Sequence, residues 1–140
     1  MASVRGAEYV GLRICPGFAF NDVKDPNPQE TFEGLLSAIR HLPLAYLHLM
    51  RASTIDVLAL GRDFFDGALL LNGGYDGDSA ADAVSGGEVT AVSFATHYIA
   101  NPDLVERLRN KLPLAQANPD LMYTPTVEGY ADYPAYSQDQ

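Results

Sequence analysis

The chain has 140 residues, of which 47% are apolar and 19% charged, so it has the length and composition of one globular domain with a hydrophobic core. Its net charge of −9 argues against nucleic acid or an anionic membrane surface as a partner, because both are bound through basic patches. The first residues lack the apolar stretch of a secretory signal and no apolar run could span a bilayer, so we expect a cytoplasmic protein without a membrane partner.

Strand-like and helix-like segments alternate in chain order. Short apolar runs bounded by glycine, proline or asparagine predict strands, and apolar residues at helical spacing predict the helices between them. The predicted strands cover residues 9–14, 45–50, 68–71 and 89–94, and the predicted helices cover 31–41, 54–65, 79–85 and 103–112. Pro28 suits the first position of a helix, and the stretch 113–140, rich in proline, tyrosine and aspartate, is expected to be mostly irregular.

This alternation predicts an α/β fold. Strands separated by helices at these spacings form βαβ units and a parallel sheet. Four such units give either a small doubly wound sheet or half of a (β/α)8 barrel, and the pattern alone does not separate the two. No sequence repeat is evident, so we expect residues 1–140 to form a single domain with the irregular segment 113–140 packed on it.

A set of segments in matching order and spacing links the chain to a known family. They are Glu8-Tyr-Val-Gly-Leu-Arg-Ile-Cys-Pro16, Phe20-Asn-Asp22, Leu44-Ala-Tyr-Leu-His-Leu49, Asn72-Gly-Gly-Tyr75, Ile99-Ala-Asn-Pro-Asp-Leu104 and Glu128-Gly-Tyr-Ala-Asp-Tyr-Pro134. Together these segments resemble the C-terminal half of the Old Yellow Enzyme family, the FMN-dependent NAD(P)H:flavin oxidoreductases. The resemblance covers nearly the whole chain and implies strands 5–8 of a (β/α)8 TIM barrel.

The resemblance also implies positions for the cofactor and the substrate. Arg13 matches the family's arginine beside the flavin ring, where a permanently charged guanidinium stabilises negative charge near the N1/C2-carbonyl edge. Gly73 and Gly74 match a turn whose amides contact the FMN phosphate. Ala95-Thr96 stands where the family usually has a Gly-Arg pair that holds this phosphate, and Tyr123 falls where it has an aromatic residue near the active-site mouth.

Two departures from the family pattern affect what the chain is expected to do. Ala95 adds a methyl group where the backbone approaches phosphate, and Thr96 lacks the charge for a bidentate contact. Nearby amides, in a turn followed by a helix entered at Asn101-Pro102-Asp103, still suit an anion. The family's first four strands supply most flavin contacts, the His/Asn or His/His pair that binds the substrate carbonyl and the proton-donating tyrosine, so we expect no catalytic residue in this chain.

The remaining titratable side chains predict no further site and no metal. Three histidines, His41, His48 and His97, lack metal-ligand spacing, and we interpret His48 as a satisfied core histidine rather than an acid or ligand at the barrel top. Cys15, the only cysteine, excludes an internal disulfide and is expected to be a small buried hydrophobic residue. The residues interpreted as solvated or helix-end charges and as packing anchors are Asp63, Asp66, Asp76, Asp78, Asp82, Tyr130, Tyr133 and Tyr136.

By resemblance, the chain is the FMN-binding portion of an oxidoreductase that passes hydride from NAD(P)H through FMN to an activated alkene, a small-molecule substrate. The alternative is a non-catalytic remnant or non-flavin relative that has lost FMN binding; a barrel with non-redox chemistry, such as isomerisation, is a third possibility. The isolated chain is expected to be inactive. A half barrel leaves strand edges open at 9–14 and 89–94, so we expect it to pair with a complementary N-terminal half-barrel, to form a homo-oligomer or to aggregate.

Overall fold

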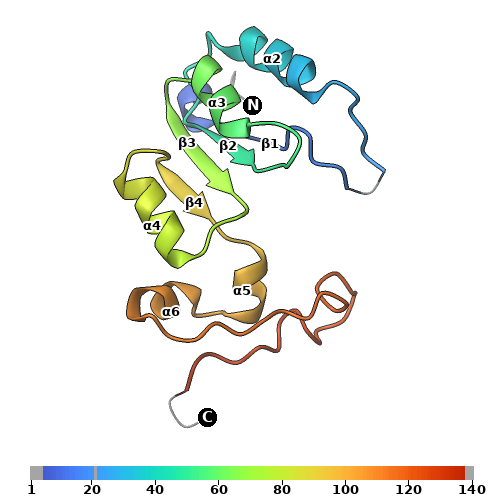
Figure 1. Cartoon of the computed structure of the whole chain (residues 1–140), viewed down its shortest axis with the longest axis vertical. Helices are drawn as coiled ribbons and strands as arrows, with labels where there is room; N and C mark the ends of the chain where they lie inside the picture. Colours follow the sequence, from blue (N-terminus) through green and yellow to red (C-terminus); the bar gives the residue numbers. More distant parts are fainter. Residues whose placement is uncertain (1–4, 21, 138–140) are drawn as a thin grey trace. The chain divides into compact units, whose positions relative to one another are not determined.

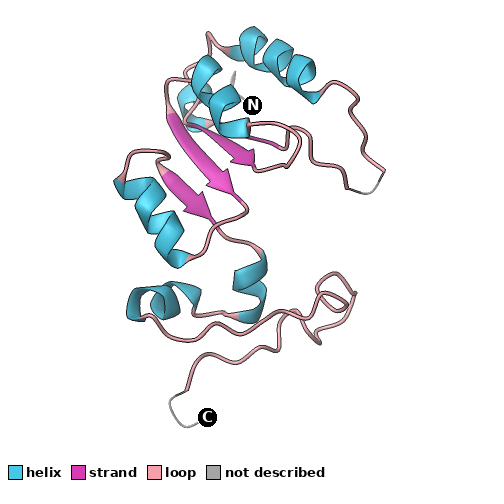
Figure 2. Cartoon of the chain, viewed as in Figure 1, coloured by secondary structure: helices cyan, strands magenta, loops and turns pink. Residues whose placement is uncertain are grey.

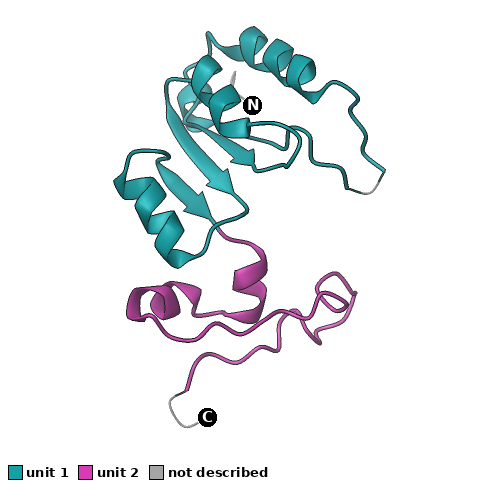
Figure 3. Ribbon diagram, viewed as in Figure 1, with its two compact units in different colours: residues 1–93 teal, residues 94–140 magenta. Residues whose placement is uncertain are grey.

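The structure is a computed structural model that describes residues 5–20 and 22–137. Asn21, which belongs to the Phe20-Asn-Asp22 motif, lies outside the described residues, as do residues 1–4 and the last three residues of the irregular segment, 138–140. The chain divides into two compact units, Met1–Ser93 and Phe94–Gln140, which Figure 3 shows in teal and magenta.

A four-stranded parallel sheet forms the centre of the first unit (Figures 1 and 2). Its strands are β1 (Gly11–Ile14), β2 (Tyr46–Met50), β3 (Ala68–Asn72) and β4 (Ala91–Ser93), in the order β1-β2-β3-β4. The helices α2 (Pro28–Ile39), α3 (Val57–Phe64) and α4 (Gly77–Ser85) connect successive strands, and the 3-10 turn η1 (Ala7–Tyr9) precedes β1. The predicted parallel α/β architecture is therefore confirmed, because every connection is a βαβ crossover.

The two faces of this sheet differ in chemistry, because successive side chains of a strand point to opposite faces. On one face, Leu47, Leu49, Leu69 and Leu71 are buried and join one hydrophobic core with the helices. The helices contribute buried side chains to this core from α2, α3 and α4, among them Leu36, Val57, Leu60 and Ala83. The opposite face carries the intervening residues, which include Arg13, His48, Asn72 and Ser93.

Local sequence explains where the elements of the first unit begin. α2 begins at Pro28, as predicted, since proline lacks the N–H group that the first helical turn leaves unpaired. α3 begins after Asp56, whose carboxylate accepts the N–H groups of Leu58 and Ala59, so it starts later than the predicted helix 54–65. β1 is shorter than predicted because Tyr9 belongs to η1 and Val10 ends that turn, and β4 keeps three residues of the predicted 89–94.

The second unit contains two short helices, α5 (Thr96–Ala100) and α6 (Leu104–Asn110). The sequence predicts only a turn at Ala95-Thr96, but α5 starts there, with the carbonyl oxygen of Ala95 accepting N–H groups from the helix. α6 is shorter than the predicted 103–112, because Lys111 adopts a left-handed conformation (φ 53°) that ends it. Residues 113–137 contain no helix or strand.

Asn101 ties this irregular segment to the end of α5. Its side chain is fully buried and its amide donates to the carbonyl oxygens of His97 (2.8 Å) and Ala115 (3.0 Å). Its side-chain oxygen accepts the N–H group of Ala115 (2.8 Å). These bonds hold the irregular segment against the end of α5. They stabilise the fold, because a buried polar group that gives up its hydrogen bonds to water without gaining a partner costs free energy.

Arg107 makes a second set of such bonds in the same unit. It is 5% exposed, pairs with the Asp103 carboxylate (2.7 Å) and donates to the carbonyl oxygens of Pro113 and Pro134 (both 3.1 Å). Asp103 also accepts the N–H group of Tyr136 (2.8 Å), and this bond, followed by the bond from Arg107, lowers the pKa of the Asp103 carboxyl. The negatively charged carboxylate of Asp103 thus lies at the start of α6. This charge disfavours the anion site that the sequence Asn101-Pro102-Asp103 suggests there.

Candidate functional site

Polar side chains from all four strands meet on the sheet face that lies opposite the hydrophobic core. The parallel register places Arg13 of β1 beside His48 of β2, and it places Asn72 of β3 beside Ser93 of β4. Asn72 and Ser93 are the last residues of their strands, so the cluster lies toward the carboxyl ends of the sheet. In parallel α/β folds this edge of the sheet is where ligands bind.

The guanidinium of Arg13 is exposed, yet it is held by neutral partners. Its Nη1 lies 3.1 Å from Nε2 and 3.3 Å from Nδ1 of His48. Its Nη2 donates to Oδ1 of Asn72 (3.4 Å) and lies 3.8 Å from Sδ of Met50. These side chains carry no carboxylate, so Arg13 keeps its full positive charge at the face of the sheet.

Asn72 and Ser93 complete the network behind Arg13. Asn72 is 7% exposed, and its Nδ2 donates to the carbonyl oxygen of Ser93 (2.7 Å) and to Ser93 Oγ (3.1 Å). Ser93 Oγ also lies 2.8 Å from Nε2 of His48. The four side chains therefore form a closed ring of contacts that joins the first strand of the sheet to the last.

His48 has a different place from the one that the sequence suggests. It is satisfied by neighbours, but it is only partly buried and lies on the polar face, so its interpretation as a core histidine is wrong. Burial and, to a smaller extent, the charge of Arg13 lower the pKa of His48 from 6.5, so the ring is neutral at pH 7. Leu47 and Leu49 on either side face the core, which is why the surrounding sequence looks apolar.

The contact between His48 and Ser93 has the geometry of a general base beside a hydroxyl nucleophile. In hydrolases that use such a pair, an acid on the far side of the ring stabilises the imidazolium that forms. Here the cation Arg13 lies beside both ring nitrogens and opposes formation of an imidazolium. The arrangement therefore fits a structural bond to a neutral histidine and not nucleophilic catalysis.

The turn after β3 carries the two glycines predicted to contact phosphate. Gly73 and Gly74 have φ of 94° and 74°, a region that residues with a Cβ rarely adopt. The side chain of Arg51, the residue after β2, runs along this turn, with Cδ 3.4 Å and Nη1 3.7 Å from the position that a Cβ of Gly74 would take. A guanidinium thus lies beside a turn that has no side chains of its own.

Arg51 is itself held by neighbouring groups. Its Nη2 donates to the hydroxyl of Tyr75 (2.8 Å), its guanidinium carbon lies 4.6 Å from the centre of the Tyr75 ring, and that hydroxyl donates to Glu88 (3.0 Å). Burial, and then the bond to Glu88, raise the pKa of Tyr75.

Asp76 caps α4 by accepting the N–H group and the hydroxyl of Ser79, both of which lower the pKa of Asp76. This confirms the interpretation of Asp76 as a helix-end charge.

The other predicted site residues belong to the second unit. Ala95 and Tyr123 line one hollow of about 460 Å³, together with Tyr98, Ile99 and Tyr130. Tyr123 is 80% exposed, and Thr96 is the first residue of α5. Two of the three tyrosines predicted as anchors have side chains that contact other parts of this unit. The hydroxyl of Tyr133 accepts the N–H group of Asn118, and the centre of the Tyr136 ring lies 5.7 Å from the guanidinium carbon of Arg107. Tyr130 is instead more than half exposed.

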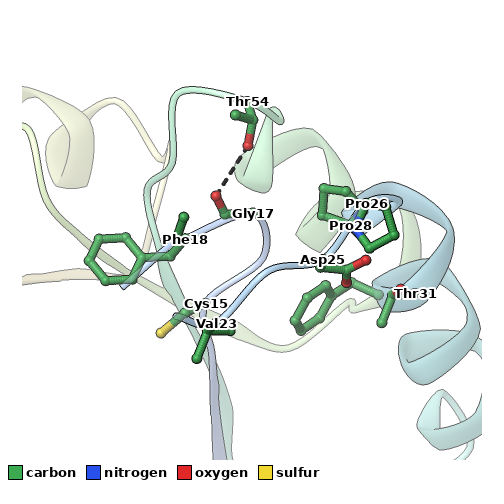
Figure 4. A pocket seen from close by; sticks show the side chains of 11 residues that line it. Cys15, Gly17, Phe18, Val23, Asp25, Pro26, Pro28, Thr31 and Thr54 are labelled. Carbon is green, nitrogen blue, oxygen red and sulfur yellow. Dashed lines mark hydrogen bonds between the residues drawn. The ribbon is translucent and has the colours of Figure 1, made fainter. Parts of the chain in front are cut away.

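A larger hollow of about 480 Å³ lies in the first unit, beside the segment that follows β1 (Figure 4). Its lining is mainly apolar and includes Phe18, Val23 and Phe32. Thr54 closes one side by donating its hydroxyl to the carbonyl oxygen of Gly17 (3.2 Å). Cys15 also lines this hollow; it is half-buried and its thiol lies 3.8 Å from Sδ of Met50, so it is not the buried residue that the sequence suggests.

Sequence reasoning finds Arg13 through the resemblance, but it misses Asn72, Ser93 and Arg51. Asn72 precedes two glycines and therefore resembles a turn residue in the sequence. Polar residues that end neighbouring parallel strands are a signal that could have identified it together with Ser93.

Across residues 5–20 and 22–137 no group of three or more His, Cys, Asp or Glu side chains is placed to bind a metal ion. Over the same residues, no helix has the length and apolar character needed to cross a membrane.

Comparisons with known proteins place these observations in a family. No family model matches the chain. A protein of Leishmania infantum named "Probable flavin mononucleotide-dependent alkene reductase" is 36% identical over 133 residues, which are 92% of this chain and 36% of that protein. The old yellow enzyme from Trypanosoma cruzi is 39% identical and superimposes with a TM-score of 0.85, over 97% of this chain and 37% of that structure.

A structure of morphinone reductase in complex with tetrahydroNAD is 32% identical, with a TM-score of 0.82 over 99% of this chain and 39% of that structure. The chain thus spans less than two-fifths of the length of the relatives that it matches. Its parallel sheet of four strands corresponds to part of their TIM barrel, as the resemblance implies. By sequence and by fold, this chain matches part of the barrel of the Old Yellow Enzyme family.

Proposed function

We propose that this chain is the flavin-contacting portion of an Old Yellow Enzyme-type oxidoreductase. The complete protein would take hydride from NAD(P)H and pass it through FMN to an activated alkene. The observation that carries this proposal is the exposed guanidinium of Arg13, held by neutral side chains at the carboxyl edge of a parallel sheet. When bound, FMN supplies the hydride transfer, and the protein supplies binding, orientation and electrostatics.

Arg13 fits the electron-rich edge of a flavin ring. A guanidinium without a carboxylate partner is attracted to an oxygen or nitrogen that carries negative charge, and its planar fork fixes the geometry of the contact. Because His48 and Asn72 approach Arg13 from neighbouring strands, the fork is held before a ligand arrives. Pre-organised charge of this kind is a common source of electrostatic stabilisation in active sites.

The phosphate end of FMN is assigned to Gly73, Gly74, Ala95 and Thr96. Two glycines at positive φ leave a turn open to an anion, and Arg51 brings a positive charge to that turn. Thr96 offers a hydroxyl, a weaker phosphate ligand than the arginine usual in the family. We therefore expect FMN binding to be weak, and we expect Arg51 to share the role that the missing arginine has elsewhere.

Substrate binding is assigned to Tyr123. Its largely exposed ring borders the same hollow as Ala95, as expected for an aromatic side chain at the mouth of a site. No residue of this chain is assigned to proton donation or to holding the substrate carbonyl, so we expect the isolated chain to be inactive as a reductase.

The sheet also supports a proposal about partners. β1 pairs only with β2, and β4 pairs only with β3, so the described sheet has two outer strands. Outer strands of a parallel sheet readily add further strands. We propose that a complementary N-terminal half-barrel, or a second copy of this chain, pairs there; light scattering after size-exclusion chromatography that gives a monodisperse monomer would contradict this.

Titration of the full chain with FMN tests the cofactor assignment. Flavin fluorescence reports binding, and flavin absorbance that elutes with the protein confirms it. We expect Arg13→Met to weaken binding by about tenfold, as for a lost charge-assisted contact, and Arg13→Lys to weaken it less. Arg109→Met, an exposed arginine of α6, is the matched control for lost charge. FMN that binds equally to wild type and to Arg13→Met would contradict the assignment.

Activity requires the part of the barrel that this chain does not match. Mixing the chain with that part of the Trypanosoma cruzi enzyme should restore NADPH-dependent reduction of an enone, and the chain alone should show none. Activity of the isolated chain would overturn the assignment of the proton donor elsewhere. The comparisons do not favour the alternative of a remnant without FMN, and the network that holds Arg13 is a further observation against it.

A further inference from the structure

We infer that His48, Asn72 and Ser93 are positioning residues: they hold the Arg13 guanidinium in one orientation and leave its charge available to an electron-rich ligand. This inference deepens the proposed function and rests on it for the identity of the ligand. It assigns roles to three residues that make no contact with the flavin in the proposal above.

The first step is the orientation of the Asn72 amide. Its Nδ2 lies 2.7 Å from the carbonyl oxygen of Ser93, which is only an acceptor, so this atom must be the nitrogen. Its oxygen then faces Nη2 of Arg13 (3.4 Å), where a donor is present. The backbone of β4 thus determines, through one buried amide, that Arg13 meets an acceptor.

The second step is the tautomer of His48. One N–H group of Arg13 cannot bond both ring nitrogens at once, because their lone pairs point in different directions. If Nε2 carries the proton, it donates to Ser93 Oγ (2.8 Å) and Nδ1 remains free to accept from Arg13. If Nδ1 carries the proton, Nε2 is the one acceptor of the ring and must serve both Ser93 and Arg13. The Nε2–H tautomer is therefore favoured, because it gives Ser93 and Arg13 separate nitrogens of the ring.

The third step is the charge of the network. His48 contacts Arg13 from β1 and Ser93 from β4. Asn72 of β3 contacts both of these residues, and Met50 of β2 contacts Arg13. Among the described residues, this network contains one cation and no carboxylate. A neutral His48 can accept from Arg13, whereas a protonated one would repel it, so the support works only while the ring is neutral.

Nuclear magnetic resonance of the full chain tests the support without any flavin. Nitrogen shifts of the imidazole rings should show His48 as the Nε2–H tautomer at pH 7.5 and should show it titrating below 6.5. In Arg13→Met the titration should move toward 6.5, because the cation is gone. The signal that disappears in His48→Gln is assigned to His48, and His41→Gln, which removes an exposed histidine, is the control that should leave this signal unchanged. An Nδ1–H tautomer, or a His48 that titrates at 6.5 in both proteins, would overturn the inference.

Flavin titration tests the consequence for binding. His48→Leu should weaken FMN binding by several-fold and Ser93→Ala by less, because the fork of Arg13 loses its orientation but not its charge. His48→Gln should restore most of the affinity, because an amide can accept from Arg13 and donate to Ser93. A structural role alone would lower thermal stability without this rescue, so unchanged affinity in His48→Leu would contradict the inference.

The two measurements separate two kinds of failure. If the wild-type chain binds no FMN while His48 shows the expected tautomer and its dependence on Arg13, the proposed function fails and the support stands. If FMN binds and depends on Arg13 but the tautomer or the rescue is not found, the proposed function stands and the support is overturned.

Discussion

Arg13 in the first unit and Arg107 in the second are both fixed by networks of side chains and backbone, but their partners differ in charge. Arg107 is 5% exposed and is neutralised by the carboxylate of Asp103. Arg13 is exposed, and the partners that hold it, His48 and Asn72, are neutral. The positive charge of Arg107 is neutralised by a carboxylate of the same chain, whereas the positive charge of Arg13 remains available to a ligand.

This difference separates a structural motif from a candidate site. The Ile99-Ala-Asn-Pro-Asp-Leu104 motif matches the family closely, and its polar residues bind the chain's own irregular segment. Among the described residues, Arg13, His48, Asn72 and Ser93 bond mainly to one another, and they lie at the sheet edge where parallel folds bind ligands. A close match to a family motif therefore marks a fixed part of the fold as readily as a part that binds a cofactor.

The largest expected effect is a loss of stability when the structural network around Asn101 is removed. Asn101→Ala removes a fully buried amide and leaves two carbonyl oxygens and one N–H group without partners, so it should destabilise the protein by about 3 kcal/mol. Urea denaturation measures this cost, and limited proteolysis should cut first within 113–137. Asn118→Ala, which lies in the exposed part of the same segment, should cost much less than Asn101→Ala.

A paired substitution compares the two arginines directly. Arg107→Met should lower the midpoint of thermal unfolding clearly, since it leaves Asp103 and two carbonyl oxygens without their donor. Arg13→Met should lower stability less than Arg107→Met does, because Arg13 is exposed and the one buried acceptor that loses its donor is Asn72 Oδ1, while it weakens FMN binding. Equal losses of stability in the two variants would remove the distinction between them.

The smallest expected effect is on the dependence of stability on pH. The pKa of His48 is lowered from 6.5 on folding, so the folded state binds fewer protons, and this contribution to stability is lost as the pH falls below 6.5. The pKa of Asp103 is lowered from 3.8, so its contribution persists to lower pH and is lost only below 3.8. Thermal unfolding against pH should show the upper step, of no more than about 2 °C, in wild type and not in His48→Gln.

Most of the fold could be predicted because it depends on local pattern. The leucines of β2 and β3 alternate with residues of the other face, and Pro28 marks the start of α2. α5 could not be found in this way, because Thr96, Tyr98 and Ile99 are poor helix formers and the helix depends on its surroundings. β4 is overestimated because the apolar run continues beyond the residues that pair with β3.

The candidate site could be predicted only in part, because it is a property of register. His48 lies between two core leucines, and only its pairing with Arg13 shows that it belongs to the polar face. Asn72 and Ser93 are far apart in the sequence and meet because β3 and β4 end together. Sequence alone indicated Arg13 by resemblance, but the groups that hold it become visible only when the strands are aligned.

The strand order of the sheet has a consequence for how the protein is made. Each strand pairs with the strand that follows it in the chain, so no pairing waits for a segment from the far end. The sheet is therefore expected to grow in the order of synthesis, with every new helix and strand extending an existing edge. The last strand to arrive supplies Ser93, so the ring around Arg13 closes only when β4 is in place.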